Sequence, residues 1–540
     1  MHKKKFMVSV ISTMMILSLV GCGDKESDKG HDLSNKGFEA VDDVTDNGLG
    51  GGYNTNSTYS KGDTYEDYVE PDFNTEEYDY IKENGFIKVG TQPLSTFAAD
   101  VDTGSYCNFR RMINDNIEDI PSGTIRTEEM INYFDYDVTE KSDGKFTVNS
   151  EIHTCPWNED NKLLMLTVQA NDVDIENKGN NFVFLIDTSG SMQSDDKAKL
   201  VTKSFNALVD SLNENDMVSV VTYAGDTQTL LEGCSGDKTT KIKDAIKEAE
   251  ELTYGTGGGT NGSGGIEKAY EVALNNYIKG GNNRVIIASD GDMNLGVTSN
   301  SGLVDLIKEK KESGVFLTTL GYGSGNYGCG NYSDSNMESI ADAGNGNYYY
   351  IDCLDEAKHV LVEKLKETTI TVAKDVKMQV EFNPNYVAEY RLIGYENRVM
   401  NADDFEDDTK DGGEVGAGQQ VTVCYELILG DGHNGKDLKY QDNATLSDAA
   451  YSNEILTLSV NYKEVDEDKS QTEEYPILDE ETEMSEDFSF VVGVIETSMI
   501  VRDSDYKGTA TIISAREFAQ NGSKNNEYRE EFAKLIKNLE

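Results

Sequence analysis

The central third of the chain alternates continuous apolar runs with segments whose apolar residues recur every three or four positions. Apolar runs of strand length are typical of strands buried on both faces, and the three-to-four periodicity is typical of amphipathic helices. The predicted strands lie at 182–186, 217–223, 227–231, 285–289, 315–320 and 348–351, with helices at 197–213, 240–252 and 265–277 between them. This order predicts an α/β fold with a doubly wound, mostly parallel sheet over residues 176–370.

The segments on both sides of this region contain runs typical of β-strands. They lie at 145–153 and 163–169 before the α/β region, and at 371–382, 419–429 and 455–462 after it. We expect these strands to form a β-sandwich into which the α/β domain is inserted. The predicted parts are an N-terminal α+β segment at 77–175, a β-rich C-terminal domain at 371–485 and a closing helical group at 486–540.

The first 22 residues have the organisation of an export signal. Lysines at positions 3–5 precede an apolar run that is too short for a stable membrane span. The run ends in Leu19-Val20-Gly21-Cys22, which resembles the lipoprotein box of bacteria. The resemblance implies removal of residues 1–21 and lipid attachment to Cys22, which would anchor the protein in the cell membrane, facing the extracellular or periplasmic side. The alternative is an ordinary signal peptide followed by a chance cysteine.

Residues 22–76 are rich in Gly, Asp, Asn and Ser and show no apolar period, which predicts a flexible tether. The whole chain has 99 Asp and Glu residues against 48 Lys and Arg, a net charge of −51. This charge argues against nucleic acid as a partner, because binding to a phosphate backbone needs a basic surface. An anionic membrane surface would also repel the protein unless a metal ion or a lipid anchor intervened.

Three polar loops of the α/β region need a common explanation. Asp187, Ser189 and Ser191 come directly after the strand at 182–186, Thr260 lies in a glycine-rich loop, and Asp290 follows the strand at 285–289. In a doubly wound sheet, a crevice forms at the carboxyl ends of the strands where the winding reverses. If these two strands are the neighbours there, two carboxylates and three hydroxyls converge. Such an all-oxygen set suits a hard cation such as Mg²⁺.

This pattern resembles the von Willebrand factor type A domain and its metal-ion-dependent adhesion site. That family has Asp-x-Ser-x-Ser after the first strand, a Thr in a later loop and an Asp after the fourth strand. The resemblance implies that Ser189 and Ser191 bind the metal directly, Thr260 directly or through water, and Asp187 and Asp290 largely through water. It also implies Mg²⁺, with Mn²⁺ or Ca²⁺ possible, and a protein partner that donates a carboxylate to the open sixth position. The alternative is a domain that keeps the motif without using a metal.

The flanking segments also resemble one family of bacterial lipoproteins that carry this domain. The similar segments are 95–106, 108–111 and 126–134 before the α/β region, and 373–384 and 390–398 after it. The resemblance covers about residues 85–540. The biological role of that family is poorly defined, so this similarity informs the fold and the site more than the function.

Two short motifs suggest enzymatic chemistry instead. Asp102-Thr103-Gly104-Ser105 resembles the aspartic-protease motif, but that chemistry needs two carboxylates that share a proton, and the chain has no second Asp-Thr/Ser-Gly. Asp100-Val101-Asp102 resembles the Asp-x-Asp of metal-dependent phosphatases, but Gly104 stands where that family has Thr or Val. We interpret Asp102, Thr103 and Ser105 as the start of a helix and expect the protein not to be an enzyme.

These observations predict a membrane-anchored surface lipoprotein that binds a protein partner through a Mg²⁺-dependent adhesion site. The first alternative is an envelope assembly scaffold in which the metal is structural. The second is a metal-assisted hydrolase.

The chain has seven cysteines. With Cys22 lipidated, an even number remains, which in an exported protein is typical of disulfides. Cys329 and Cys353 follow the last two predicted strands of the α/β domain, and if those strands are neighbours both thiols lie at one sheet edge. We therefore predict a Cys329–Cys353 disulfide. Cys155 and Cys424, both on predicted sandwich strands, are a second candidate pair, and free thiols throughout are the alternative.

Overall fold

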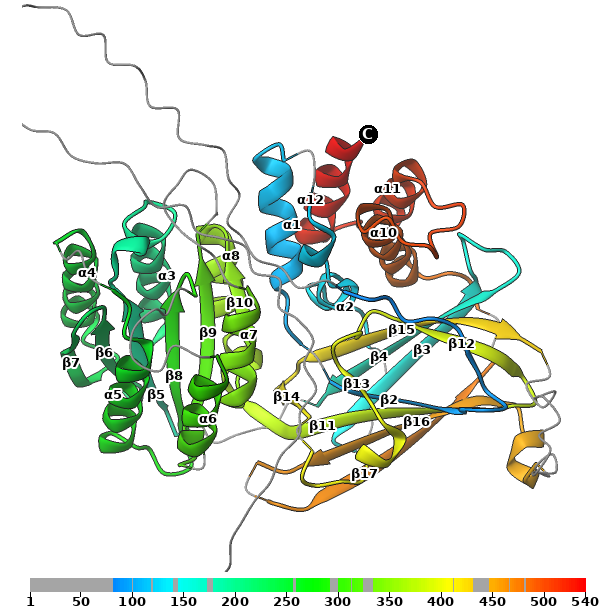
Figure 1. Ribbon diagram of the computed structural model, residues 1–540, viewed down its shortest axis with the longest axis horizontal. Coiled ribbons are helices and arrows are strands. Elements are labelled where there is room, and N and C mark those ends of the chain that lie inside the picture. Colours follow the sequence, from blue (N-terminus) through cyan, green and yellow to red (C-terminus); the bar gives the residue numbers. More distant parts are fainter. Residues whose placement is uncertain are drawn as a thin grey trace, which may run out of the picture. The chain divides into compact units, whose positions relative to one another are not determined.

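The apolar runs of the central third form one six-stranded sheet in the computed structural model (Figure 1), with the order β10-β9-β8-β5-β6-β7. All neighbouring strands are parallel except β7, which is an antiparallel edge strand. The winding reverses between β5 and β8, which confirms the predicted doubly wound α/β fold. The bounds are β5 (Asn180–Asp187), β6 (Met217–Tyr223), β7 (Thr227–Ser235), β8 (Asn282–Ser289), β9 (Phe316–Tyr322) and β10 (Tyr348–Ile351).

The structure describes residues 81–99, 101–117, 120–138, 144–171, 178–255, 259–291, 300–311, 313–323, 334–410, 412–430, 446–465, 467–479 and 482–540. The expected signal peptide, Cys22 and the expected tether at 22–76 lie outside these residues. Within the described ranges, no helix combines the length and the apolar content that are needed to cross a bilayer.

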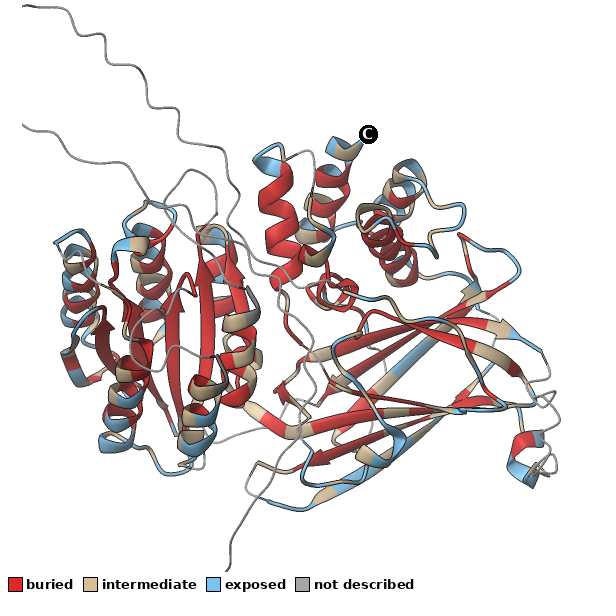
Figure 2. Cartoon of the chain, viewed as in Figure 1, coloured by how far each residue is buried: buried red, intermediate tan, exposed pale blue. Residues whose placement is uncertain are grey.

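Helices cover both faces of this sheet and create two cores. Alternate side chains of β5 point to opposite faces, so that Phe184 belongs to one core and Leu185 to the other. Figure 2 shows the strands of the sheet buried between these helices. The first core includes side chains of α3 (Ala198–Ser211) and α4 (Thr239–Gly255). The second includes side chains of α5 (Gly262–Asn275), α6 (Asn300–Lys311) and α7 (Asp334–Ala343).

Two further sheets combine strands from before and after the α/β domain. Their orders are β1-β12-β15-β4-β3 and β13-β2-β11-β16-β17, with β14 paired to β11. One hydrophobic core contains side chains from both sheets, among them Leu166 and Met378. This confirms the predicted β-sandwich with an inserted domain. The bounds are β1 (Ile87–Lys88), β2 (Leu94–Ala98), β3 (Phe146–Thr154), β4 (Lys162–Ala170), β11 (Thr371–Phe382), β12 (Val387–Ile393), β13 (Val399–Met400), β14 (Gly413–Gly416), β15 (Gln420–Leu429), β16 (Glu454–Lys463) and β17 (Ser470–Leu478).

The predicted closing helices are also present, and they share a core with helices from the N-terminal segment. The C-terminal helices are α10 (Glu486–Val501), α11 (Ile512–Asn521) and α12 (Glu527–Leu535), and the N-terminal ones are α1 (Gly104–Asn114) and α2 (Thr127–Asn132). Helix α10 is buried over most of its length (Figure 2). Between β10 and β11 the chain forms α8 (Leu354–Lys358), a π-helical turn (His359–Glu363) and α9 (Leu365–Thr369).

The second candidate disulfide is wrong, because Cys155 and Cys424 are free thiols. Cys155 follows β3 and Cys424 lies in β15, but β4 stands between these two strands in the sheet. Two strand spacings separate β3 from β15 by about 10 Å, beyond the Cα separation of about 7 Å that a disulfide can span.

Candidate metal centre

The two aspartates of the predicted site end neighbouring strands of the central sheet. Asp187 is the last residue of β5, and Asp290 directly follows β8. Ile186 is paired with Ala288, so the register places Asp187 beside Ser289. The Ser289 hydroxyl donates a hydrogen bond of 2.9 Å to Asp187 Oδ2. Both aspartates are buried at the predicted reversal of the winding.

The loop after β5 brings two hydroxyls together. Asp187 Oδ1 accepts a hydrogen bond of 2.9 Å from the backbone N–H of Ser189. This bond holds the first turn of the loop, and the following short 3₁₀ helix (Gly190–Met192) carries Ser191. The Oγ atoms of Ser189 and Ser191 lie 3.0 Å apart. Ser189 is buried while Ser191 is half-buried, so the pair reaches from the interior towards the surface.

The loop that carries Thr260 is tied to the same edge of the sheet through β6. Asn261 N–H donates to the Ala224 carbonyl at 2.7 Å, and Thr188 N–H donates to the Tyr223 carbonyl at 2.9 Å. Both loops are therefore bonded to consecutive residues at the end of β6. Thr260 itself is buried.

The electrostatics of the site are dominated by two buried carboxylates and one buried ammonium group. Burial and the neighbouring Asp290 carboxylate raise the pKa of Asp187 to about 7. Lys197 Nζ lies 2.9 Å from Asp290 Oδ2 and 3.0 Å from the Ser191 carbonyl oxygen. The sequence analysis did not include Lys197 in the site. Its position four residues before the buried Val201 could have indicated that it lies on the inner face of the helix.

The donor chemistry fits a hard divalent cation. The five predicted residues contribute only carboxylate and hydroxyl oxygens, which are the ligands that Mg²⁺ prefers in proteins. Burial and repulsion from the Asp290 carboxylate both disfavour the charged form of Asp187 and raise its pKa. A divalent cation would relieve this repulsion.

A second cluster of charged groups and a thiol surrounds Arg110 in α1. Arg110 Nη2 lies 2.6 Å from Asp352 Oδ1, 2.8 Å from Glu356 Oε2 and 3.8 Å from Cys107 Sγ. The ligand atoms of Cys107, Asp352 and Glu356 lie within 4.8 Å of one another, a spacing compatible with a metal ion. The guanidinium group already supplies the positive charge there. We interpret this cluster as a buried ion-pair network that joins α1 to the segment after β10.

Cys353 lies beside the same network. Its Sγ is a free thiol 4.0 Å from Arg110 Nη2, and it accepts a hydrogen bond from the Glu356 N–H at the start of α8. The strands before Cys329 and Cys353, β9 and β10, are parallel neighbours as expected. Because Cys353 is a free thiol, the predicted Cys329–Cys353 disulfide is wrong; Cys329 itself lies outside the described residues.

The residues of the protease-like motif have structural contacts. Asp102 Oδ1 accepts a hydrogen bond of 2.9 Å from the Tyr348 N–H, and Asp102 Oδ2 lies 3.4 Å from Arg398 Nη2. Thr103 stands at the N-cap position of α1, although its side chain forms no capping hydrogen bond. The Ser105 hydroxyl accepts from the Arg126 N–H at 3.0 Å. Asp100 lies outside the part of the chain that the structure describes.

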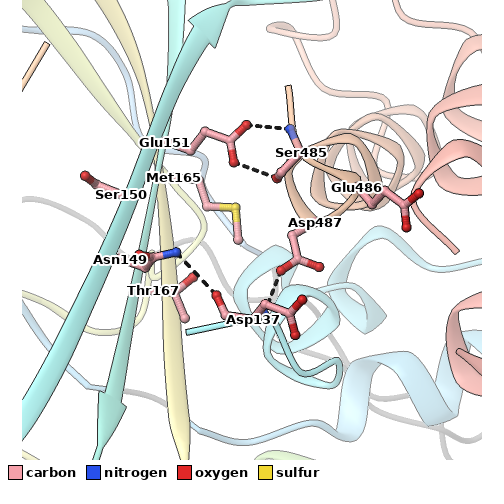
Figure 3. A pocket seen from close by; sticks show the side chains of 9 residues that line it. All are labelled: Asp137, Asn149, Ser150, Glu151, Met165, Thr167, Ser485, Glu486 and Asp487. Carbon is pink, nitrogen blue, oxygen red and sulfur yellow. Dashed lines mark hydrogen bonds between the residues drawn. The ribbon is translucent and has the colours of Figure 1, made fainter. Parts of the chain in front are cut away.

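An acidic hollow lies between β3, β4 and the start of α10 (Figure 3). Glu151 accepts hydrogen bonds from both the N–H and the hydroxyl of Ser485, at 2.8 and 2.6 Å. Asp487 Oδ2 accepts from the Asp137 N–H at 2.6 Å. Figure 3 shows these carboxylates turned towards their hydrogen-bond partners. Ser485 is the N-cap of α10, so these contacts fix the helix to the sandwich.

Three parts of the chain match known protein families. Residues 181–363 match the von Willebrand factor type A domain, residues 72–165 match a family described as von Willebrand factor, and residues 367–540 match the C-terminal domain of uncharacterized protein YfbK. Uncharacterized protein YfbK of Escherichia coli (strain K12) is 38% identical over 474 residues, which cover 86% of this chain and 80% of the relative.

Solved structures with similarity to the chain include a von Willebrand factor type A protein from Catenulispora acidiphila. It is 15% identical, with a TM-score of 0.39, and the match covers 74% of this chain and 92% of that chain. The ArnB paralog VWA2 from Sulfolobus acidocaldarius is 16% identical, with a TM-score of 0.34 and a coverage of 73% and 98%.

Proposed function

Because the chain belongs to the YfbK family and carries a von Willebrand factor type A domain, we propose that it binds a protein partner through a Mg²⁺-dependent adhesion site. The observation that carries the proposal is the pair of buried aspartates that end neighbouring strands, with the hydroxyls of Ser189 and Ser191 3.0 Å apart beside them. The proposal assigns no catalytic step to this site.

The residues of the site have distinct tasks in this proposal. Ser189 and Ser191 are the direct ligands, and Thr260 binds the metal directly or through water. Asp187 and Asp290 hold water ligands, and Asp187 also fixes the Ser189 backbone through the hydrogen bond to its N–H. Mg²⁺, when bound, supplies local positive charge that attracts a carboxylate of the partner. That charge would let a chain with a net charge of −51 bind an acidic group.

The proposal also includes the lipid anchor. Lipid on Cys22 would hold the protein at the outer side of the cell membrane, and several acyl chains on one cysteine bind more firmly than one. Residues 22–76 would act as a tether, and a flexible chain of this length reaches roughly 40 Å. The metal site would then reach partners beyond the membrane surface.

Two measurements on the purified protein test the metal site and its role. Mn²⁺ is titrated into wild type, Asp187→Ala and Asp195→Ala, with Mn²⁺ as a spectroscopic substitute for Mg²⁺. Asp195 is the matched control, because its exposed carboxylate lies near the same loop and pairs only with Lys199 among the described ion pairs. We expect Asp187→Ala to lower the Mn²⁺ affinity about tenfold or more, and Asp195→Ala to leave it unchanged.

The second measurement is retention of envelope proteins by immobilised wild type and Asp187→Ala, in Mg²⁺ and in chelator. Adhesion through the metal is supported if an envelope protein is retained by wild type in Mg²⁺, and is retained neither in chelator nor by Asp187→Ala. Equal retention in all conditions, together with Mn²⁺ binding by wild type, favours the scaffold with a structural metal. Absence of Mn²⁺ binding by wild type contradicts both functions.

A further inference from the structure

Lys197 brings a fixed positive charge into the metal centre. Its side chain is only 3% exposed, and its Nζ bonds to Asp290 Oδ2 at 2.9 Å and to the Ser191 carbonyl oxygen at 3.0 Å. The ammonium group therefore touches one predicted ligand residue through its carboxylate and another through its backbone. A buried lysine is costly unless it is paired, so this geometry indicates a specific electrostatic task.

The surrounding structure is shaped to accommodate this side chain. Gly323, directly after β9, has a φ of +99°, and a Cβ there would lie 2.1 Å from Lys197 Cε. Only glycine leaves room for the lysine stem at this position. Lys197 also occupies the N-cap of α3, where the positive end of the helix dipole disfavours a cation. The lysine is therefore held in place against its local helix preference.

Resting on the proposed function, we propose that Lys197 is a built-in counter-cation that makes the metal centre bind its cation more weakly and an anionic partner more strongly. Asp187 and Asp290 give the metal-bound site two negative charges, and Lys197 reduces this total to one. A divalent ion then leaves the loaded centre with a net charge of +1. A carboxylate from the partner neutralises that charge. Without Lys197 the loaded centre would be neutral, and a carboxylate would add an uncompensated charge.

A purely structural role for Lys197 leads to the opposite expectation. If the ammonium only holds Asp290 in position, its removal loosens a residue of the site and weakens metal binding. If it acts as a counter-cation, its removal strengthens metal binding, because a positive charge next to the ion is lost. The direction of the change in metal affinity separates the two roles.

The experiment compares wild type, Lys197→Met and Lys199→Met as purified full-length proteins. Methionine keeps an unbranched apolar stem without the charge. Lys199 is the matched control, because it lies on the same helix but is half exposed and pairs with Asp195 away from the aspartates of the site. Mn²⁺ affinity is measured by electron paramagnetic resonance of the free ion. Acetate is then titrated as a carboxylate probe, and water-proton relaxation reports the displacement of water from bound Mn²⁺.

We expect Lys197→Met to bind Mn²⁺ about tenfold more tightly or better, to bind acetate several-fold more weakly, and Lys199→Met to match wild type. Should Lys197→Met fold only with metal, removal of Mn²⁺ by a competing chelator measures the same affinity, and Lys197→Gln serves as a second variant. Unchanged or weaker Mn²⁺ binding, or unchanged acetate binding, in Lys197→Met overturns this inference and leaves the proposed function standing. If neither wild type nor Lys197→Met binds Mn²⁺, both fail.

Discussion

Glu496 is a buried carboxylate on helix α10. Its replacement by glutamine should stabilise the protein at neutral pH. The residue is 1% exposed. Burial raises the pKa of Glu496 from its ordinary value of 4.5 to about 7, although a hydrogen bond from the Ser514 hydroxyl opposes this rise. The bond to Glu496 Oε2 measures 2.7 Å. The same hydroxyl also lies 2.9 Å from the Thr511 carbonyl oxygen, so its single proton has two competing acceptors.

The size and sign of the contribution of Glu496 to the free energy of unfolding follow from its pKa of 4.5 in the unfolded protein and about 7 in the folded protein. Below pH 4.5 the carboxyl is protonated in both the folded and the unfolded protein, and its titration costs no stability. Between pH 4.5 and 7 the unfolded protein releases the proton while the folded protein keeps it, so the free energy of unfolding falls as pH rises. Above pH 7 the loss is complete and amounts to about 3 kcal/mol.

The assay is denaturant unfolding of wild type, Glu496→Gln and Glu486→Gln at pH 4 and at pH 8. The glutamine side chain of Glu496→Gln cannot ionise. Relative to wild type, the free energy of unfolding of this variant should therefore be about 3 kcal/mol higher at pH 8 than it is at pH 4. Glu486 lies on the same helix with an exposed side chain, and its variant should show no such difference. An equal effect of Glu496→Gln at both pH values would refute the reasoning.

Two further substitutions test other parts of the fold. Gly493→Ala should destabilise the protein by about 2 kcal/mol, since a Cβ there would lie 2.6 Å from the Ala515 carbonyl oxygen. Thermal unfolding measures this loss. Gly255→Ala is the control, because a Cβ at Gly255 would contact nothing within 4 Å. Arg110→Met should cost about 3–5 kcal/mol, because it leaves the buried Glu356 and the half-buried Asp352 without their counter-ion. In denaturant unfolding, a second substitution, Glu356→Gln, should recover part of that loss, and strictly additive losses would contradict the network.

The sequence was most informative where one local rule decides the structure. The short apolar run at 182–186 predicted a buried strand, and Asp187 at its end was expected at the carboxyl edge of the parallel sheet. Strand β17 escaped prediction because its residues are largely exposed and include Glu473 and Glu474, so that no apolar run marks it. Its pairing with β16 decides its conformation instead.

The residues of the metal site also divide into those that a local rule predicts and those that depend on contacts between distant parts of the chain. Asp187 and Asp290 were predictable because each stands at the carboxyl end of a predicted strand, and the pairing of the two strands brings them together. The task of Lys197 depends on a contact with Asp290 across 93 positions of sequence and on the space that Gly323 leaves. The failed pairing of Cys155 with Cys424 has a related cause, since it required the order of strands within one sheet.

The way the α/β domain is inserted into the sandwich sets an order for folding. Every strand of the six-stranded sheet comes from residues 180–351, so this sheet can form as soon as that stretch has been synthesised. Each sandwich sheet, by contrast, combines strands from both sides of the insertion, as in the pairing of β2 with β11 and of β4 with β15. Strand β2 must therefore wait for partners synthesised hundreds of residues later, and such distant pairings form slowly. During that interval the strand edges that later pair with β11 and β15 are exposed on β2 and β4, and the chain is then most prone to aggregate.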